Sequence, residues 1–259
     1  MSFEVFPIPD RPVLRIEGEE TALCVGDLHI GIEADLRYRG IIVPSQTHRM
    51  ENELKELSEG VDRLIIIGDV KHQVPGSTRQ EHVEVPRFFN DLLNLYPRID
   101  LVKGNHDTNI ESMLPSRVQV HEQGGMVMGD IGFVHGHAWP SPEVMSCRLL
   151  IMGHNHPAVI FEDGLHHNQV ERCWVRCHFK DVPNERYPKV PEEAILIPAF
   201  NRTLGGGPVN LEKPRMLGPL LGNELLDLEN GKVYLMDGLF LGTVSSLRVK
   251  RRGYFRLED

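Results

Sequence analysis

Five apolar segments of this sequence end at, or next to, a glycine that is accompanied by polar side chains. A buried strand that ends in this way places carboxylate, imidazole and amide groups where the chain leaves the core. The pattern limits the possible folds more than the overall composition does, because all five segments need buried positions in one core. The segments are ALCVGDLHIG, RLIIIGDVKH, LVKGNHDTNI, IGFVHGH and LLIMGHNHP, and they carry Asp27, His29, Asp69, Asn105, His106, Asp107, His135, His154 and His156.

The first half of the sequence alternates predicted strands with predicted helices. Strands are predicted at 21–26, 64–67 and 99–102, where apolar and β-branched residues dominate. Between them, a helix is predicted over 45–59, begun by Ser45 and ended by Gly60. A second helix is predicted over 86–96, with Pro86 in its first turn. This βαβαβ order predicts parallel strands joined by right-handed crossovers.

After residue 115 the pattern changes to short strands joined by glycine-containing turns. Ser141 and Pro142 predict a single helical turn, and the polar, proline-bearing stretches within 162–193 predict surface loops. We therefore expect one α/β domain over 1–259, with a β-rich half at 157–259. The strands predicted in this half are 158–162, 172–179, 194–198 and 232–236.

Composition is that of an ordinary globular protein. The 259 residues are 41% hydrophobic and 25% charged, and the formal net charge of −9 argues against strong non-specific binding to duplex DNA. No apolar run is long enough for a membrane span, and the first residues do not resemble a secretion signal. Four cysteines do not suggest a disulfide framework, so a reducing cytoplasm is the expected location.

The polar residues are expected to meet, because the carboxyl ends of parallel strands gather at one edge of a sheet. Asp27 and Asp69 would repel each other there unless a cation compensated them. Carboxylate, imidazole and amide ligands suit manganese, iron or zinc better than calcium, and the absence of cysteine argues against a closed structural zinc site. The donors are more numerous than one metal needs, which favours two metals bridged by a carboxylate.

The motifs DLH, GD, GNHD, HGH and GHNH, in this order, resemble the calcineurin-like metallophosphoesterase superfamily over residues 25–156. GDLHIG, GDVKH and IPAFNRTLGGGPVN look closest to the predicted archaeal and bacterial phosphoesterases that include the DNA-ligase-associated group. The resemblance implies a four-layer sandwich in which two mixed β-sheets pack face to face and are flanked by helices. It also implies two divalent metal ions, manganese first, with iron, zinc and nickel as alternatives.

The resemblance also implies a role for each motif residue. Asp69 would bridge the two metals, and His106 would stabilise charge on the phosphate or protonate the leaving oxygen. Asp107 would orient His106 and favour its charged form. The first metal would be held by Asp27, His29 and His156, and the second by Asn105, His135 and His154. Seen alone, Asp27 is equally compatible with a helix cap and Asp69 with a turn, but five motifs in family order outweigh those readings.

Several other residues are weaker candidates. Lys71 and His72 are predicted to contact substrate, although a solvated lysine is an alternative, and Asn201 and Arg202 are further predicted contacts. His137 is expected to support the site without ligating.

Three further segments have competing interpretations. The glycine run 205–207 is read as a flexible loop near the site in preference to a phosphate cradle. Cys173 and Cys177 are expected to be buried in a strand, against a zinc site with His166, His167 or His178. The basic segment 248–256 is expected to be a solvated edge, with nucleic-acid contact as the alternative.

The leading functional prediction is a dinuclear metal-dependent phosphoesterase, most plainly a phosphodiesterase, in which a hydroxide between the metals attacks phosphorus. Its substrate would be a phosphoester, such as a nucleotide or a nucleic acid. One alternative is a nuclease in DNA or RNA processing. Another is a subunit of weak activity that binds a DNA helicase or ligase.

Overall fold

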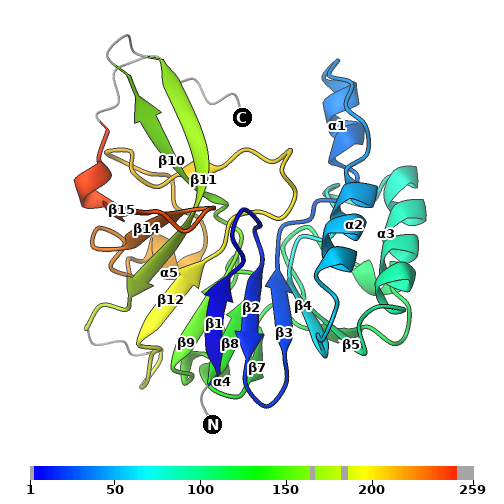
Figure 1. The fold of residues 1–259 in the computed structure, drawn as a ribbon, viewed down its shortest axis with the longest axis horizontal. Helices are drawn as coiled ribbons and strands as arrows, with labels where there is room; N and C mark the ends of the chain where they lie inside the picture. The colour runs from blue at the N-terminus through cyan, green and yellow to red at the C-terminus, as the bar shows by residue number, and fades with distance from the viewer. Residues whose placement is uncertain (1–2, 164–166, 182–185, 250–259) are drawn as a thin grey trace.

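Two β-sheets pack face to face in the computed structural model, which describes residues 3–163, 167–181 and 186–249 (Figure 1). The first sheet has the order β1-β2-β3-β4-β5-β6, and its strands β3 to β6 are parallel. This arrangement confirms the parallel strands predicted from the first half of the sequence. The strands are β1 (Glu4–Pro7), β2 (Leu14–Glu17), β3 (Ala22–Val25), β4 (Arg63–Ile67), β5 (Arg98–Val102) and β6 (Gln119–His121).

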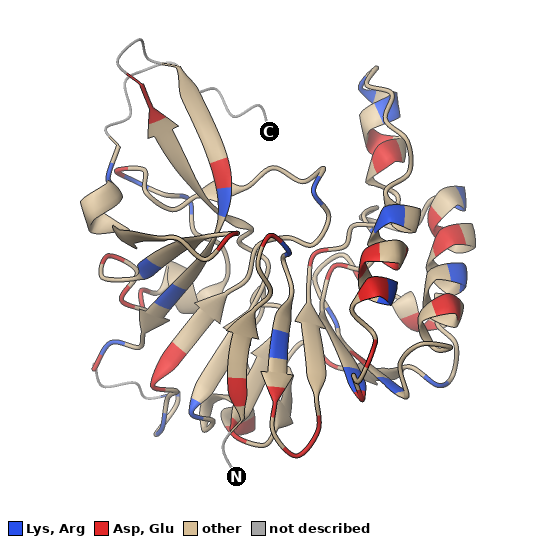
Figure 2. Ribbon diagram, in the orientation of Figure 1, with Lys and Arg blue, Asp and Glu red and all other residues tan. Residues whose placement is uncertain are grey.

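Helices α2 (Thr47–Glu56) and α3 (Arg79–Leu92) cover the outer face of the first sheet, while α1 (Ile32–Tyr38) projects beside them (Figure 1). Side chains alternate along each strand, so Leu64 and Ile66 contact the helices and Ile65 and Ile67 contact the second sheet. Both faces are apolar, which explains why this strand reads as a continuous apolar run. Figure 2 shows that charges are frequent on the helices, whereas the central strands β3, β8 and β9 carry none.

The start of α3 corrects the prediction for Pro86. The helix begins at Arg79, because Thr78 and Glu81 form a capping box in which each side chain accepts a hydrogen bond from the other's backbone N–H. Pro86 lies inside this helix and not in its first turn. The neighbouring Val85 and Phe88 are fully buried, and this packing outweighs the missing proline hydrogen bond.

Other element boundaries also differ from the predictions. Helix α2 begins at Thr47, and Ser45 accepts a 3.3 Å hydrogen bond from the Thr47 N–H without being its N-cap. The sequence analysis missed β1, β2 and α1, which are too short for a clear hydrophobic period. The predicted turn at Ser141 is confirmed, because its side chain accepts from the Val144 N–H at the start of α4 (Pro142–Met145).

The second sheet has the order β13-β10-β11-β12-β9-β8-β7, with β14 paired to β11 and to β15. Its outer face is covered by loops and by the single-turn helices α4 and α5 (Pro219–Gly222), so the fourth layer of the sandwich is thin. The predicted α/β sandwich with two mixed sheets is confirmed. The strands are β7 (Met126–Met128), β8 (Ile131–Val134), β9 (Leu149–Met152), β10 (Pro157–Glu162), β11 (Asn168–His178), β12 (Glu193–Leu196), β13 (Gly207–Pro208), β14 (Lys232–Leu235) and β15 (Phe240–Thr243), and the 3-10 turns are η1 (Ile110–Met113) and η2 (Ser245–Leu247).

The strand predicted at 172–179 begins earlier in the structure, within a stretch that was predicted as surface loop. Strand β11 begins at Asn168, which pairs with Glu162 at the end of β10, so the two strands form a long hairpin that rises above the sandwich (Figure 1). Parts of the predicted loop, 164–166 and 182–185, lie outside the described residues. Within the described residues, no helix has the length and apolar character that a membrane span requires.

A buried ion cluster joins strands β4, β5 and β6 of the first sheet. The fully buried Asp100 accepts hydrogen bonds from Arg63 Nε at 2.8 Å and Arg98 Nε at 2.9 Å, and its other oxygen lies 2.6 Å from His121 Nε2. Burial raises the pKa of Asp100, but the hydrogen bonds from His121 and Arg63 outweigh it and hold this pKa well below its ordinary value. The ionised carboxylate is therefore part of the folded state.

Asp100→Asn should destabilise the protein by about 3 kcal/mol near neutral pH, because it leaves the buried Arg63 with only Glu20 as an anionic partner. The pKa of Asp100 is lower in the folded than in the unfolded protein. The stability that its carboxylate contributes is therefore complete above the ordinary pKa of 3.8, and it is lost as the pH falls toward the folded pKa. Urea unfolding near pH 7 and near pH 3 should therefore show a smaller difference at the lower pH. An equal difference at both pH values would contradict this, and the exposed Asp237→Asn serves as control.

Candidate metal centre

The predicted site residues lie on loops that leave the carboxyl ends of strands in both sheets. Asp27 follows β3, Asp69 follows β4, and Asn105 follows β5, whereas His135 follows β8 and His154 follows β9. Backbone contacts join the loops of the two sheets, because the His154 N–H donates to Asp27 Oδ2 at 3.2 Å. Strand ends from both sheets therefore meet at one place.

Two sets of three donors emerge from this convergence. In each set the ligand atoms lie within 4.8 Å of one another. The first set has the members that the resemblance implied, whereas the second contains Asp69 in place of Asn105, and the ligand roles stay a prediction. The first set is Asp27, His29 and His156, and the second is Asp69, His135 and His154.

Asp69 lies between the two sets. Its Oδ2 is 3.4 Å from His29 Nε2 and 3.3 Å from His135 Nε2. Its Oδ1 accepts a 2.9 Å hydrogen bond from the His106 N–H, which fixes the orientation of the carboxylate. One oxygen of Asp69 therefore faces an imidazole of each set, which is the position that a bridging ligand requires.

Asn105 joins the second set through its side chain. Its Oδ1 lies 3.1 Å from His135 Nε2, so its amide oxygen faces the same space as the imidazole. His135 Nδ1 lies 3.1 Å from the Ile67 carbonyl, an interaction that would fix the ring and leave Nε2 directed at the site. His137 lies outside both sets, and its Nε2 is 3.3 Å from Gln123 Oε1.

Backbone strain is concentrated at these residues. Asp27 at φ 57°, Asp69 at φ 51° and His154 at φ 70° adopt the left-handed region that side-chain-bearing residues rarely occupy. His29 and His156, both at φ 43°, share this conformation. Each such residue costs of order 1 kcal/mol or more, and such strain clusters at functional sites. The chain here is held in the geometry that places the donors together.

Two glycines make room for the donors. A Cβ on Gly104 would collide with Asp69 Oδ1 and with its backbone nitrogen, and a Cβ on Gly68 would collide with the His135 ring. Gly68 also has a φ of 83°, which favours glycine. The glycines that end the apolar runs are therefore needed for the close approach of ligand side chains from neighbouring strands.

The donor atoms fit a cation. Asp27 Oδ1, His29 Nε2 and His156 Nε2 are buried and have no hydrogen-bond partner among the described residues, although Asp27 Oδ1 and His156 Nε2 are only 3.1 Å apart. Orphaned polar atoms are rare in buried positions, and here all three belong to one donor set. A bound divalent cation would satisfy them together.

The electrostatics favour ionised carboxylates in this site. Burial raises the pKa of Asp69, but the His135 and His29 imidazoles outweigh it and hold the pKa well below its usual range. Burial lowers the pKa of His135, whereas Asp69 and Asp27 raise it to about 9. In the absence of a metal, the imidazole of His135 would thus carry the compensating positive charge that a cation would otherwise supply.

His106 lies beside the two donor sets. Asp107 was predicted to orient its imidazole, but the hydrogen bonds of the Asp107 carboxylate go to backbone groups instead. His106 Nδ1 is in a short contact with the His72 carbonyl, and its Nε2 lies 4.0 Å from Asp69 Oδ2. The Asp107 carboxylate accepts from the Gly104 and Val70 N–H groups at 2.8 Å and so positions the ligand loops.

The predicted effect of Asp107 on the charge of His106 stays a prediction. Burial lowers the pKa of His106, and the Asp69 carboxylate opposes this shift. Asp107 itself is fully buried, and burial together with the Asp69 charge raises its pKa to about 6.

The predicted substrate contact of Lys71 is not supported by its position. Its side chain is buried, and Nζ donates to the carbonyls of Gln73 and Gly76 at 2.7 and 2.8 Å, so it fixes the loop after β4. His72 does reach the site, because its Nδ1 lies 3.1 Å from His29 Nδ1. With His29 and His106 it forms a third possible donor set.

Asn201 and Arg202 are also placed differently from the prediction. Asn201 is fully buried, with Nδ2 donating to the Leu28 carbonyl at 2.8 Å, so it supports the loop between Asp27 and His29 and does not face substrate. Arg202 is at the surface and binds Glu53 of α2 through Nη2 at 3.2 Å.

The glycine run 205–207 lies beside the site, as predicted. The Gly207 N–H donates to the His156 carbonyl at 2.8 Å, and Gly207 belongs to β13, so the run is not wholly loop.

The expected burial of Cys173 and Cys177 is confirmed. Both are free and buried on the outer face of β11, and burial raises the pKa of Cys177 to about 12. No donor set in the described part of the chain includes a cysteine. His166 and most of the basic segment, 250–256, lie outside the described residues.

Glu81 is a supporting residue that the sequence analysis missed. Its fully buried Oε1 accepts from the N–H groups of His72 and Gln73 at 2.9 and 2.6 Å, so the start of α3 holds the His72 loop. The sequence signals only the start of the helix, because Thr78 and Glu81 have the spacing of a capping box.

Comparisons with known proteins agree with this fold. No protein-family model and no curated protein matches the sequence. Among solved structures, nuclease MPE of Pseudomonas putida is 20% identical, with 92% of this chain and 100% of that chain covered and a TM-score of 0.52. The two chains therefore share a fold over almost their whole lengths.

Two further solved structures resemble this chain more weakly. Yfce, a phosphoesterase from E. coli, is 20% identical over 55% of this chain and 74% of its own, with a TM-score of 0.34. A predicted phosphoesterase from Streptococcus pneumoniae is 11% identical over 87% of this chain and 94% of its own, with a TM-score of 0.29. These scores add nothing to the fold assignment.

Gly104→Ala should weaken binding of Mn²⁺ by about tenfold or more, because the new Cβ displaces the Asp69 carboxylate. Gly205→Ala is the matched control, since a Cβ there meets nothing within 4 Å. Isothermal titration with Mn²⁺ measures the effect, and thermal unfolding checks that both variants are folded. Equal affinity in the two variants would show that Asp69 is not confined as described.

Proposed function

We propose that this protein is a metal-dependent phosphodiesterase of the calcineurin-like superfamily, in the group of predicted phosphoesterases that includes the DNA-ligase-associated type. The observation that carries the proposal is the position of Asp69, whose Oδ2 lies 3.4 and 3.3 Å from imidazoles of two separate donor sets. Two divalent metal ions, manganese first and iron, zinc or nickel as alternatives, fit this carboxylate, imidazole and amide donor set. Such ions would polarise a phosphoryl group and make a water molecule more acidic.

The residues around the donor sets have separate tasks in this proposal. His106 is partly exposed, with 24% of its side chain accessible, and it borders Asp69 without belonging to either of the two main sets. It is therefore placed to donate a proton or a hydrogen bond to an oxygen of the bound ester. Asp107 and Glu81 hold the backbone on either side of this imidazole.

A diester suits the charges near the site better than a monoester. Two cationic side chains that adjoin the donor loops are already engaged, Lys71 with two carbonyls and Arg202 with Glu53. A phosphomonoester carries close to two negative charges at neutral pH, whereas a diester carries one. Apart from the two proposed metal ions, the donor loops offer imidazoles and few free cationic side chains to compensate the second charge of a monoester, which favours the singly charged ester.

A nuclease is the second candidate, and an arginine cluster favours it. Burial lowers the pKa of Arg172, and the nearby Arg202 and Arg49 guanidinium groups lower it further, while the Glu53 and Glu171 carboxylates oppose them, so three positive and two negative charges lie together. Arg202 follows Asn201, whose N–H donates to the Asp27 carbonyl at 3.3 Å, so the cluster adjoins the site. Such a cluster would suit further phosphates of a polynucleotide. A subunit that binds a helicase or ligase stays a prediction without a supporting contact.

Asp69→Asn should lose both bound metals and reduce hydrolysis of bis(p-nitrophenyl) phosphate by at least about 100-fold, because one oxygen of this side chain faces both sets. Metal content measured by mass spectrometry gives a readout independent of turnover. The exposed Asp181→Asn is the control with the same chemical change. Full turnover with Mn²⁺ in the Asp69 variant would remove the basis of the proposed function.

His106→Ala should retain both metals but lose activity in a way that depends on the leaving group. For a p-nitrophenyl ester, whose leaving group needs no proton, the loss should be below about tenfold, and for an alkyl ester it should exceed about 100-fold. Loss of one metal in this variant would instead place His106 in the third donor set with His29 and His72. Equal losses for both esters would refute the proton-donor role.

A further inference from the structure

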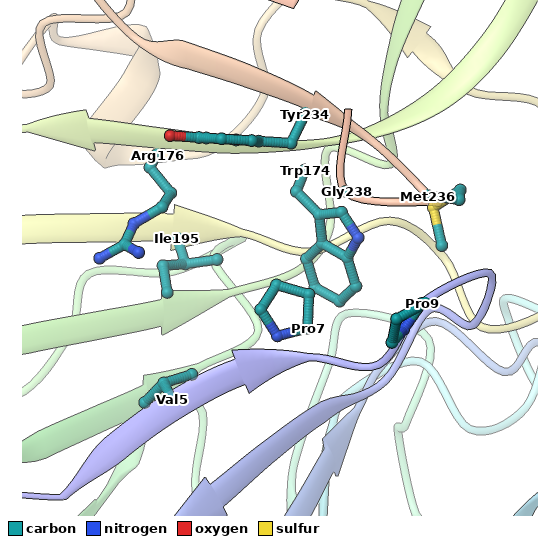
Figure 3. A pocket seen from close by; sticks show the side chains of 9 residues that line it. All are labelled: Val5, Pro7, Pro9, Trp174, Arg176, Ile195, Tyr234, Met236 and Gly238. Carbon is teal, nitrogen blue, oxygen red and sulfur yellow. The ribbon is translucent and has the colours of Figure 1, made fainter. Parts of the chain in front are cut away.

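A second cavity lies at the open edge between the two sheets, apart from the metal centre (Figure 3). It has a volume of about 250 Å³ and none of its lining residues belongs to the donor sets. Val5 and Pro7 of β1 form one wall, and Trp174 of β11 and Tyr234 of β14 form the opposite wall. The surface of this cavity is thus mostly carbon.

Trp174 has an unsatisfied polar atom at this cavity. Its side chain faces the space between the sheets and is only 1% exposed, and its Nε1 has no hydrogen-bond partner in the described part of the chain. In Figure 3 the indole nitrogen is directed toward the end of the cavity where Met236 lies. Buried indole N–H groups usually find an acceptor, so this donor lacks the partner that its position requires.

Water alone does not fit this cavity well. One water molecule occupies about 30 Å³ of liquid and needs two or more polar partners, so filling the space would need several waters with few groups to bind. The cavity is partly open to solvent, and water inside it would meet mostly carbon, whereas an apolar molecule with one acceptor would cover that carbon and satisfy Trp174.

Arg176 defines the charge at the other end of the cavity. Its Nε donates to Glu193 Oε1 at 3.2 Å, and its Nη2 is paired with Glu193 Oε2, so the guanidinium charge is already compensated. Because Glu193 compensates the Arg176 charge, the cavity does not need an anionic ligand to balance it. Its volume lies just below the usual range for drug-sized ligands, which favours a small molecule.

We propose that this cavity is a binding site for a small planar apolar molecule that carries one hydrogen-bond acceptor, which accepts from Trp174 Nε1. Proline, tryptophan and tyrosine rings give the cavity flat walls, and the single orphaned donor fixes where the acceptor lies. The site is independent of the proposed phosphodiesterase activity.

Coumarin is a suitable probe, because it is planar and apolar and carries a lactone carbonyl. Titration into the full-length protein should shift the Trp174 indole N–H resonance with a dissociation constant of roughly 1 mM. Trp139→Phe assigns this resonance, because the sequence has only 2 tryptophans. No shift at saturating coumarin, with rapid exchange of this N–H with water, would show that water alone occupies the cavity and would overturn the proposal.

Two variants test the contacts by ligand-observed NMR. Trp174→Phe keeps a ring but removes the donor, and it should weaken coumarin binding about fivefold. Val5→Phe should abolish binding by filling the cavity, and it decides the matter if the tryptophan variant does not fold. Val170→Phe, an exposed valine outside the cavity, is the matched control. Unchanged binding in Trp174→Phe or in Val5→Phe would overturn the proposal.

Discussion

The approach of Asp69 to imidazoles from both sheets is the interaction on which the site depends. A carboxylate in a buried position is unfavourable unless opposite charge or hydrogen bonds compensate it. Here His29 and His135 approach its Oδ2, and the His106 N–H fixes its Oδ1. The two sheets must therefore end their strands at the same place, since the first sheet supplies Asp69 and His29 and the second supplies His135.

Packing between the sheets and hydrogen bonds in the loops hold the donor residues in position. The apolar layer between the sheets, which includes Ile65, Phe133 and Ile151, fixes their relative position. Close packing of this layer resists small displacements, and displacements of that size would separate the donors. The strained backbone at the ligands is maintained by hydrogen bonds from their surroundings, such as the contact of the Asp27 N–H with the Gly68 carbonyl at 3.0 Å.

Several polar residues near the site support its loops and do not face the space between the donor sets. Lys71, Asn201 and Asp107 were expected to meet substrate or His106, yet each is buried and bonded to backbone groups of the loops that carry the site. A polar residue that is adjacent in sequence to a metal-donor residue can stabilise the loop instead of contacting the substrate. The sequence pattern does not distinguish these roles, because burial of a loop residue depends on the segments packed over it.

The sequence by itself determined the strand–helix alternation, the parallel strands β3, β4 and β5, and the residues that the structure brings into two donor sets. These follow from local properties, namely apolar runs, glycine and the order of polar side chains along the chain. Only the tertiary structure decided that Lys71 and Asn201 are internal, that Glu81 supports His72, and that Trp174 faces a cavity without a partner. Those features depend on which segments pack over each side chain, and the sequence pattern does not encode that packing.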